Sequence, residues 1–134
     1  MNEVVKFLEE NPIQYLATVG LDGKAKVRPF MFMLEREVKL YFCTSNQKEV
    51  YKEIKNSNYV EITTASPEFA WIRISGKVIF SDDIGIKKEI IDKSEIVRSQ
   101  YQTPSNPNLE VFYLVEAKAT IADFSGEPPK EYKI

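Results

Sequence analysis

Hydrophobic residues fall in short runs divided by polar turns, a pattern typical of strands rather than of long helices. A central pair of such runs covers Val27–Met33 and Leu40–Cys43, and the segment between them, Leu34–Glu37, is mostly charged. The pattern predicts two strands joined by a tight turn about Glu35 and Arg36.

The second of these strands leads into a predicted helix. Thr44, Ser45 and Asn46 are residue types that favour a helix N-cap. An apolar face with helical spacing follows from Gln47 to about Lys55. Together they predict that the strand passes directly into a capped helix.

The same pattern predicts the other elements. A first helix is expected over Glu3–Glu10 with Asn2 as its cap, and a longer helical region from Ile84 to about Tyr101 with Ser81-Asp82-Asp83 as its cap. The expected strands are Ile13–Val19, Lys24–Met33, Val38–Cys43, Tyr59–Thr64, Phe69–Phe80 with a bend at Gly76, and Leu109–Asp123. Six strands with inserted helices predict a mainly β, antiparallel barrel, formed as one domain over residues 1–134.

The predicted hairpin gathers basic and hydroxyl side chains at one end. Arg28 would lie opposite Cys43 or Thr44, and Ser45 and Lys48 would follow at the start of the helix, where free N–H groups and the positive dipole end point. Such a group of donors forms an anion site, most naturally for a phosphate. The alternative is a set of solvated surface charges and ordinary caps, and spacing alone leaves both interpretations open.

Composition narrows the classes of function. The chain of 134 residues has a net charge of -2, so no basic field favours nucleic acid or an anionic membrane. It has no histidine, which excludes Ser-His and Cys-His catalysis, and with Cys43 as the one cysteine a zinc site is not expected. The lone cysteine, with no signal-peptide pattern and no apolar run of about 20 residues, predicts a cytoplasmic protein.

Several motifs, in order, resemble the pyridoxamine 5'-phosphate oxidase-like family of FMN-binding split barrels, close to its general-stress-protein-like and nitroimidazole-resistance-like members. They are Val-Arg-Pro-Phe-Met-Phe at 27–32, Leu-Tyr-Phe-Cys-Thr-Ser at 40–45, Lys48, and Trp-Ile-Arg-Ile-Ser-Gly-Lys-Val at 71–78. The resemblance runs from about Ile13 to Phe124. It implies a six-stranded antiparallel split β-barrel of the FMN-binding type.

The resemblance also implies a cofactor site and a homodimer with FMN at the subunit interface. Basic and hydroxyl side chains would hold the phosphate, the backbone after Arg28 would meet the flavin ring, and Trp71 would approach the flavin from the partner subunit. The expected cofactor-binding residues are Arg28, Pro29, Phe30, Met31, Cys43, Thr44, Ser45, Gln47, Lys48 and Trp71. No metal and no catalytic side chain are expected, because a flavin brings its own reactivity.

Three functions remain open at this point. The first is an FMN-dependent oxidoreductase that passes electrons from a nicotinamide donor to a small organic acceptor. The second is a flavin-binding or redox-sensing stress protein without turnover, and the third is a cofactor-free barrel that binds another macromolecule. True pyridoxamine phosphate oxidases carry an Arg-x-His motif, so oxidation of vitamin B6 is not expected of a chain without histidine.

Overall fold

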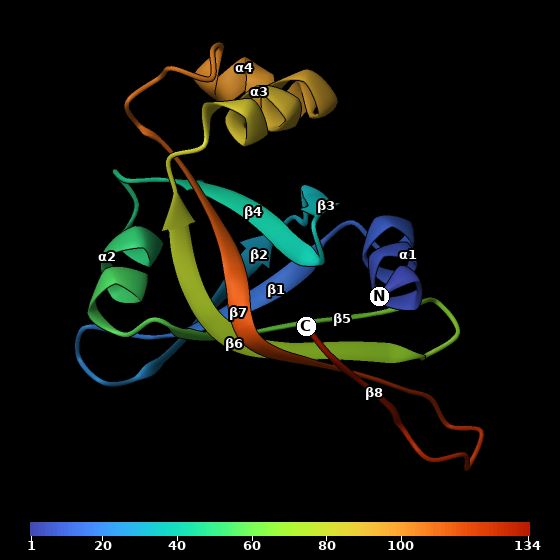
Figure 1. Cartoon of the computed structure of the whole chain (residues 1–134). Helices are drawn as coiled ribbons and strands as arrows, with labels where there is room; N and C mark the ends of the chain where they lie inside the picture. The colour runs from blue at the N-terminus through green and yellow to red at the C-terminus, as the bar shows by residue number, and fades with distance from the viewer.

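The structure is a computed structural model that describes residues 1–134, with one sheet of eight strands and helices on its flanks and at one end (Figure 1). No helix is both long enough and apolar enough to span a membrane. The elements in chain order are α1 (Asn2–Glu10), β1 (Gln14–Val19), β2 (Ala25–Phe30), β3 (Leu34–Arg36), β4 (Lys39–Ser45), α2 (Glu49–Asn56), β5 (Tyr59–Ala65), β6 (Trp71–Ser81), α3 (Ile84–Lys93), α4 (Glu95–Tyr101), β7 (Leu109–Ala122) and β8 (Lys130–Lys133).

All strand pairs are antiparallel, in the order β2-β1-β5-β6-β7-β4-β3, with β8 added on β7. The two long strands, β6 and β7, curve through the whole molecule (Figure 1). The ladder between them shifts register between Ser75 and Lys77. A Cβ atom at Gly76 would come within 2.9 Å of the Cβ of Ala117, so the close approach of β7 requires glycine there. The predicted bend at Gly76 is confirmed.

The main core lies inside the curved sheet and is covered by α1 and α2. Helix α1 contributes Val4 and Leu8, and α2 contributes Val50 and Ile54. The rings of Phe42 on β4 and Phe112 on β7 stack in this core with centroids 5.6 Å apart. The two amphipathic helices therefore cover apolar surface that the open sheet would leave exposed.

A second apolar cluster joins α3 and α4 to the outer face of β4 and β7. It includes Ile90 and Val97 from the helices and Tyr41 and Val111 from the strands. Both faces of β4 are consequently buried, which explains why its sequence is a nearly continuous apolar run rather than an alternating one. Figure 1 shows these two helices at one end of the molecule, apart from α1 and α2.

The predicted hairpin between Val27–Met33 and Leu40–Cys43 is wrong. Strand β2 pairs with β1, with Arg28 opposite Leu16, and it is the short β3 that pairs with β4. The turn falls at Glu37 and Val38, which both have positive φ, rather than about Glu35 and Arg36. Pro29 stays within β2, opposite Tyr15, and the strand ends at Phe30; beyond it, Phe32 donates its N–H to the side chain of Gln14 instead of to a ladder.

Two predicted caps are also wrong, while a third is confirmed. Asn2 lies within α1, and no side chain caps that helix. Thr44 and Ser45 belong to β4 and pair with β7, so α2 begins after Lys48 without a side-chain cap. Asp83 caps α3 by accepting the N–H groups of Gly85 and Ile86.

The remaining differences concern the number and continuity of elements. Six strands were expected and eight are present, because β3 and β8 have only three and four residues. The helical region expected from Ile84 to Tyr101 is two helices, since Ser94 has extended backbone and its hydroxyl accepts the N–H of Val97.

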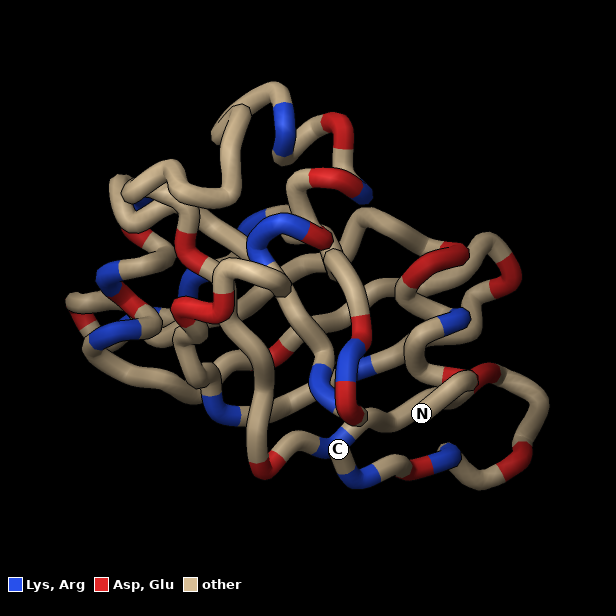
Figure 2. Tube along the Cα trace, turned by 45° about the horizontal axis from the view of Figure 1, so that its top comes forward, with Lys and Arg blue, Asp and Glu red and all other residues tan.

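Basic and acidic positions are interspersed along the trace, as Figure 2 shows.

Candidate cofactor site

A cavity of about 320 Å³ opens between the ends of β2 and β4, the start of α2, and α4. Most of its wall is apolar, and two basic side chains and a threonine hydroxyl also line it. The lining residues are Ile13, Arg28, Pro29, Phe30, Met31, Met33, Cys43, Thr44, Lys48, Val50, Ile96, Val97, Gln100 and Tyr101. An apolar pocket with a few convergent polar groups is the usual form of a site for a small molecule.

The cavity brings together most of the residues singled out from the sequence. Seven of the ten line it, namely Arg28, Pro29, Phe30, Met31, Cys43, Thr44 and Lys48. These residues come together although the predicted pairing of β2 with β4 is wrong. In the strand order, β2 is at one end of the sheet and β4 is near the other, and the curvature of the sheet brings the ends of these two strands together. Ser45, Gln47 and Trp71 do not line it.

Thr44 carries the one buried side-chain polar atom that has no hydrogen-bond partner. The residue is 3% exposed and lies on the cavity wall. An unpaired buried hydroxyl costs free energy unless a ligand or water completes it. Thr44 therefore marks the polar side of the cavity as a place where a ligand with hydrogen-bonding groups fits.

Residues of β1 and α2 hold the guanidinium of Arg28 in place. Its Nη1 donates to the carbonyl of Leu16 at 3.2 Å and to the hydroxyl of Thr18 at 2.7 Å. Its Nη2 donates to a carboxylate oxygen of Glu53 on α2 at 2.6 Å. The guanidinium is thus fixed at the cavity wall, and its charge is shared with a buried carboxylate.

Lys48 is the second cation of the cavity, and it takes part in no ion pair. The turn that carries it is closed by Ser45, whose hydroxyl accepts the N–H of Gln47 at 3.1 Å and whose carbonyl accepts that of Lys48 at 3.1 Å. The amide of Gln47 donates to the side chain of Asn46. Ser45 and Gln47 thus shape the turn rather than line the cavity.

Cys43 and Tyr101 both line the cavity, and both remain neutral at ordinary pH. Burial raises the pKa of the Cys43 thiol to about 12, with nearby Lys48 acting in the opposite direction. Burial also raises the pKa of the Tyr101 hydroxyl. A thiol with so high a pKa is protonated at neutral pH and is not an activated nucleophile.

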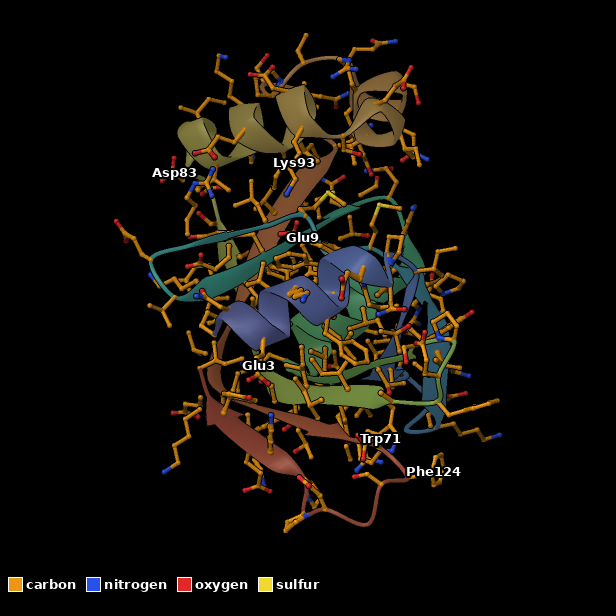
Figure 3. All side chains as sticks on the ribbon, turned by 90° about the vertical axis from the view of Figure 1, so that its right-hand side faces the viewer. Glu3, Glu9, Trp71, Asp83, Lys93 and Phe124 are labelled. Atoms are coloured by element: carbon orange, nitrogen blue, oxygen red, sulfur yellow. The ribbon has the colours of Figure 1, made fainter.

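Trp71 lies far from the cavity within the same chain. Figure 3 shows Trp71 and Phe124 at the end of the molecule opposite α3, which is marked by its cap Asp83 and its last residue, Lys93. Trp71 begins β6 and pairs with Ala122 near the end of β7. Any contact between Trp71 and the cavity would have to come from a second subunit.

Sequence reasoning missed two groups of residues. Four residues of helix α4 line the cavity. They are spaced so that they lie on one face of the helix: Ile96, Val97, Gln100 and Tyr101. The contact of Glu53 with Arg28 was also missed, although Glu53 follows Val50 by three residues and so lies on the predicted apolar face of α2. A carboxylate at such a position signals a buried partner.

The fold is a small antiparallel β-barrel, with a mostly apolar cavity at its rim that Arg28, Thr44 and Lys48 also line. The family model described as pyridoxamine 5'-phosphate oxidase matches residues 1–120, so the chain belongs to that family. No curated protein matches the sequence.

Solved structures agree with this assignment. A NimC/NimA family protein from Clostridium acetobutylicum is 28% identical, with a TM-score of 0.91 over 100% of this chain and 92% of that chain. General stress protein 26 from Bacillus anthracis is 18% identical, with a TM-score of 0.76 over 99% and 97%. A pyridoxamine 5'-phosphate oxidase-related, FMN binding protein from Nostoc punctiforme is 17% identical, with a TM-score of 0.70 over 99% and 95%. The predicted family and the split-barrel class are confirmed.

Proposed function

We propose that the chain is a flavoprotein that binds FMN non-covalently and passes electrons from a nicotinamide donor to a small organic acceptor. The observation that carries the proposal is the unpartnered, buried hydroxyl of Thr44 on a cavity wall that also presents Arg28 and Lys48. Membership of the family supports a flavin, and the neighbour from Nostoc punctiforme is itself an FMN binding protein.

The polar side of the cavity fits the phosphate of FMN. Arg28 and Lys48 supply positive charge, and Thr44 supplies a hydroxyl donor that nothing in the chain uses. Charge-assisted hydrogen bonds to a phosphate are about twice as strong as neutral ones, so these three groups favour FMN over a flavin without phosphate. Ser45 and Gln47 act indirectly, by holding the turn that presents Lys48.

The apolar side of the cavity fits the flavin ring. Pro29, Phe30 and Met31 form one wall, and Ile96 and Val97 of α4 form another. When bound, the flavin supplies the hydride and electron chemistry. The protein positions it, excludes water with apolar side chains, and adds no thiolate beside it, since the thiol of Cys43 stays protonated at neutral pH.

A second copy of the chain is the proposed partner. The outer face of β1 and β2 is apolar along its whole length, with the cross-strand pairs Tyr15–Pro29, Ala17–Val27 and Val19–Ala25. Val27 is 67% exposed there. This face is continuous with the cavity through Pro29, so a partner docked on it would complete the cavity wall and bring its own Trp71 within reach.

The deciding experiment is an absorbance spectrum of the purified protein followed by titration of the flavin-free form with FMN. We expect a flavin spectrum and saturable binding, and a loss of about 10-fold or more in affinity for Lys48→Ala, since one charge-assisted contact disappears. Lys52→Ala is the matched control, because Lys52 is exposed on α2, which begins after Lys48, and pairs only with Glu49. A protein that binds no added FMN would overturn the proposal.

Turnover separates the oxidoreductase from a flavin-binding or redox-sensing protein. Oxidation of a nicotinamide donor well beyond one equivalent of bound flavin, in the presence of a small acceptor such as a quinone, is expected of the enzyme. Reduction that stops at one equivalent would assign the chain to the non-catalytic alternative.

A further inference from the structure

We propose that Glu53 is a positioning residue of the phosphate site: it fixes Arg28 so that the free edge of its guanidinium faces the bound anion. The inference rests on the proposed function and deepens it. Glu53 does not line the cavity, and its carboxylate acts only through Arg28 and Thr18.

The contacts of Glu53 form a closed triangle. One carboxylate oxygen, Oε1, accepts both the hydroxyl of Thr18 at 2.7 Å and Nη2 of Arg28 at 2.6 Å. The hydroxyl of Thr18 in turn accepts Nη1 of Arg28 at 2.7 Å. Because Thr18 and Glu53 also contact each other, both lie on the end of the guanidinium that carries its two terminal nitrogens.

A guanidinium has five N–H donors in a fixed plane. Three of those of Arg28 are used, two by Thr18 and the carbonyl of Leu16 and one by Glu53. The two that remain are the Nε–H and the second N–H of Nη2, which share the other edge of the plane. Two parallel donors on one edge match two oxygens of a phosphate.

Burial makes this arrangement rigid. Glu53 is 5% exposed and sits on the inner face of α2, next to Ile54 of the core. A carboxylate in such a place is stable only when its charge is paired and hydrogen-bonded. The pairing therefore holds Arg28 in one orientation before any ligand arrives, which reduces the entropy that binding would cost.

The same geometry separates positioning from charge. Since Oε1 accepts both hydrogen bonds, the side-chain oxygen of a glutamine can accept them as well. Glu53→Gln thus removes the negative charge and keeps the support, whereas Glu53→Ala removes both. If the carboxylate acted only by reducing the positive charge of Arg28, both variants would raise the affinity for a phosphate.

The test compares the affinities for FMN and for riboflavin, which has the same ring without the phosphate, in fluorescence titrations. We expect the wild type to prefer FMN, Glu53→Ala to lose about 10-fold of that preference with riboflavin affinity unchanged, and Glu53→Gln to keep it. Glu49→Ala is the control, because Glu49 is exposed one turn earlier on α2. If Glu53→Ala fails to fold, Thr18→Val is the second variant: it removes one corner of the triangle that holds Arg28, leaves the Glu53–Arg28 contact, and is expected to lose part of the preference.

The outcomes are separable. A wild type that binds neither flavin, or both equally, overturns the phosphate site and this inference with it. A wild type that prefers FMN, with a Glu53→Ala variant that keeps the preference or loses affinity for both flavins alike, overturns the inference alone.

Discussion

The side-chain carbonyl of Gln14 accepts a hydrogen bond of 2.6 Å from the backbone N–H of Phe32. The amide of the same side chain donates to the carbonyls of Leu8 at 3.0 Å and Asn11 at 2.7 Å. Gln14 is fully buried, so one side chain links α1 and β1 to the irregular segment beside the cavity. This segment has no strand ladder at Phe32, and Gln14 takes the place of one.

Replacing Gln14 by leucine is expected to destabilise the protein by about 3 kcal/mol, because two buried backbone groups and one half-buried one lose their partner. Chemical denaturation followed by circular dichroism measures the change. The matched comparison is Gln47→Leu, where the exposed amide pairs only with Asn46 and a change within about 0.5 kcal/mol is expected. Equal effects of the two substitutions would contradict the assigned role of Gln14.

Thr44→Val is expected to move stability and binding in opposite directions. The valine has nearly the same shape and removes the unpaired hydroxyl, so the flavin-free protein should gain about 1 kcal/mol. The affinity for FMN should fall about 5- to 10-fold, because one donor to the phosphate is lost. Thermal unfolding and FMN titration on the same preparation test both statements, and a variant that binds FMN as well as the wild type would remove Thr44 from the site.

The raised pKa of the Cys43 thiol gives stability a defined dependence on pH. Its pKa is about 12 in the folded protein, against an ordinary value of 9.0, so above pH 9 the unfolded chain loses a proton that the folded chain keeps. Stability from this group is therefore complete below pH 9 and falls as the pH rises, by about 1.4 kcal/mol at pH 10.

Denaturation at pH 8 and pH 10 for the wild type and for Cys43→Ala isolates the contribution of Cys43. The alanine variant should be less stable at pH 8, because a cavity replaces the thiol, yet it should lose less stability between the two pH values. Identical pH dependence in the two proteins would show that the thiol is accessible to solvent.

The proposed dimer predicts the effect of a charge on the outer face of β1 and β2. Val27→Glu should yield a monomer in light-scattering measurements, since Val27 is exposed in the single chain and an unpaired carboxylate would be buried in the dimer. Ile84→Glu, at a similarly exposed position on α3, should leave the assembly unchanged. A wild-type protein that is monomeric at high concentration would overturn the proposed partner.

Local patterns predicted those elements whose residues face one core. Strand β5 alternates exposed and buried residues without exception, and it was expected at almost its observed bounds. The bend at Gly76 followed from the residue type alone. Such features are determined by residues that are close together in the sequence, so the sequence alone predicts them.

Features that depend on distant partners were not predictable. Thr44 and Ser45 suit a helix cap and a strand end equally well, and only the ladder with β7 decides between them. The wrong pairing of β2 with β4 has the same cause. Turn signals indicate where a strand ends, but not which strand it pairs with, and β2 in fact pairs with β1 while β4 pairs with β3 and β7. The support of Arg28 by Glu53 joins β2 to α2, elements that no local pattern relates.

The position of β7 has a consequence for the order in which the molecule folds. The pairs β1–β2 and β5–β6 close within short stretches of chain, whereas β4 must wait for β7, as Asn46 and Glu110, 64 residues apart, illustrate. Closing so long a loop is slow and has an entropic cost that local hairpins avoid. The wall that carries Cys43 and Thr44 therefore takes its final form late, and the cavity of a nascent chain is complete only after β7 has left the ribosome.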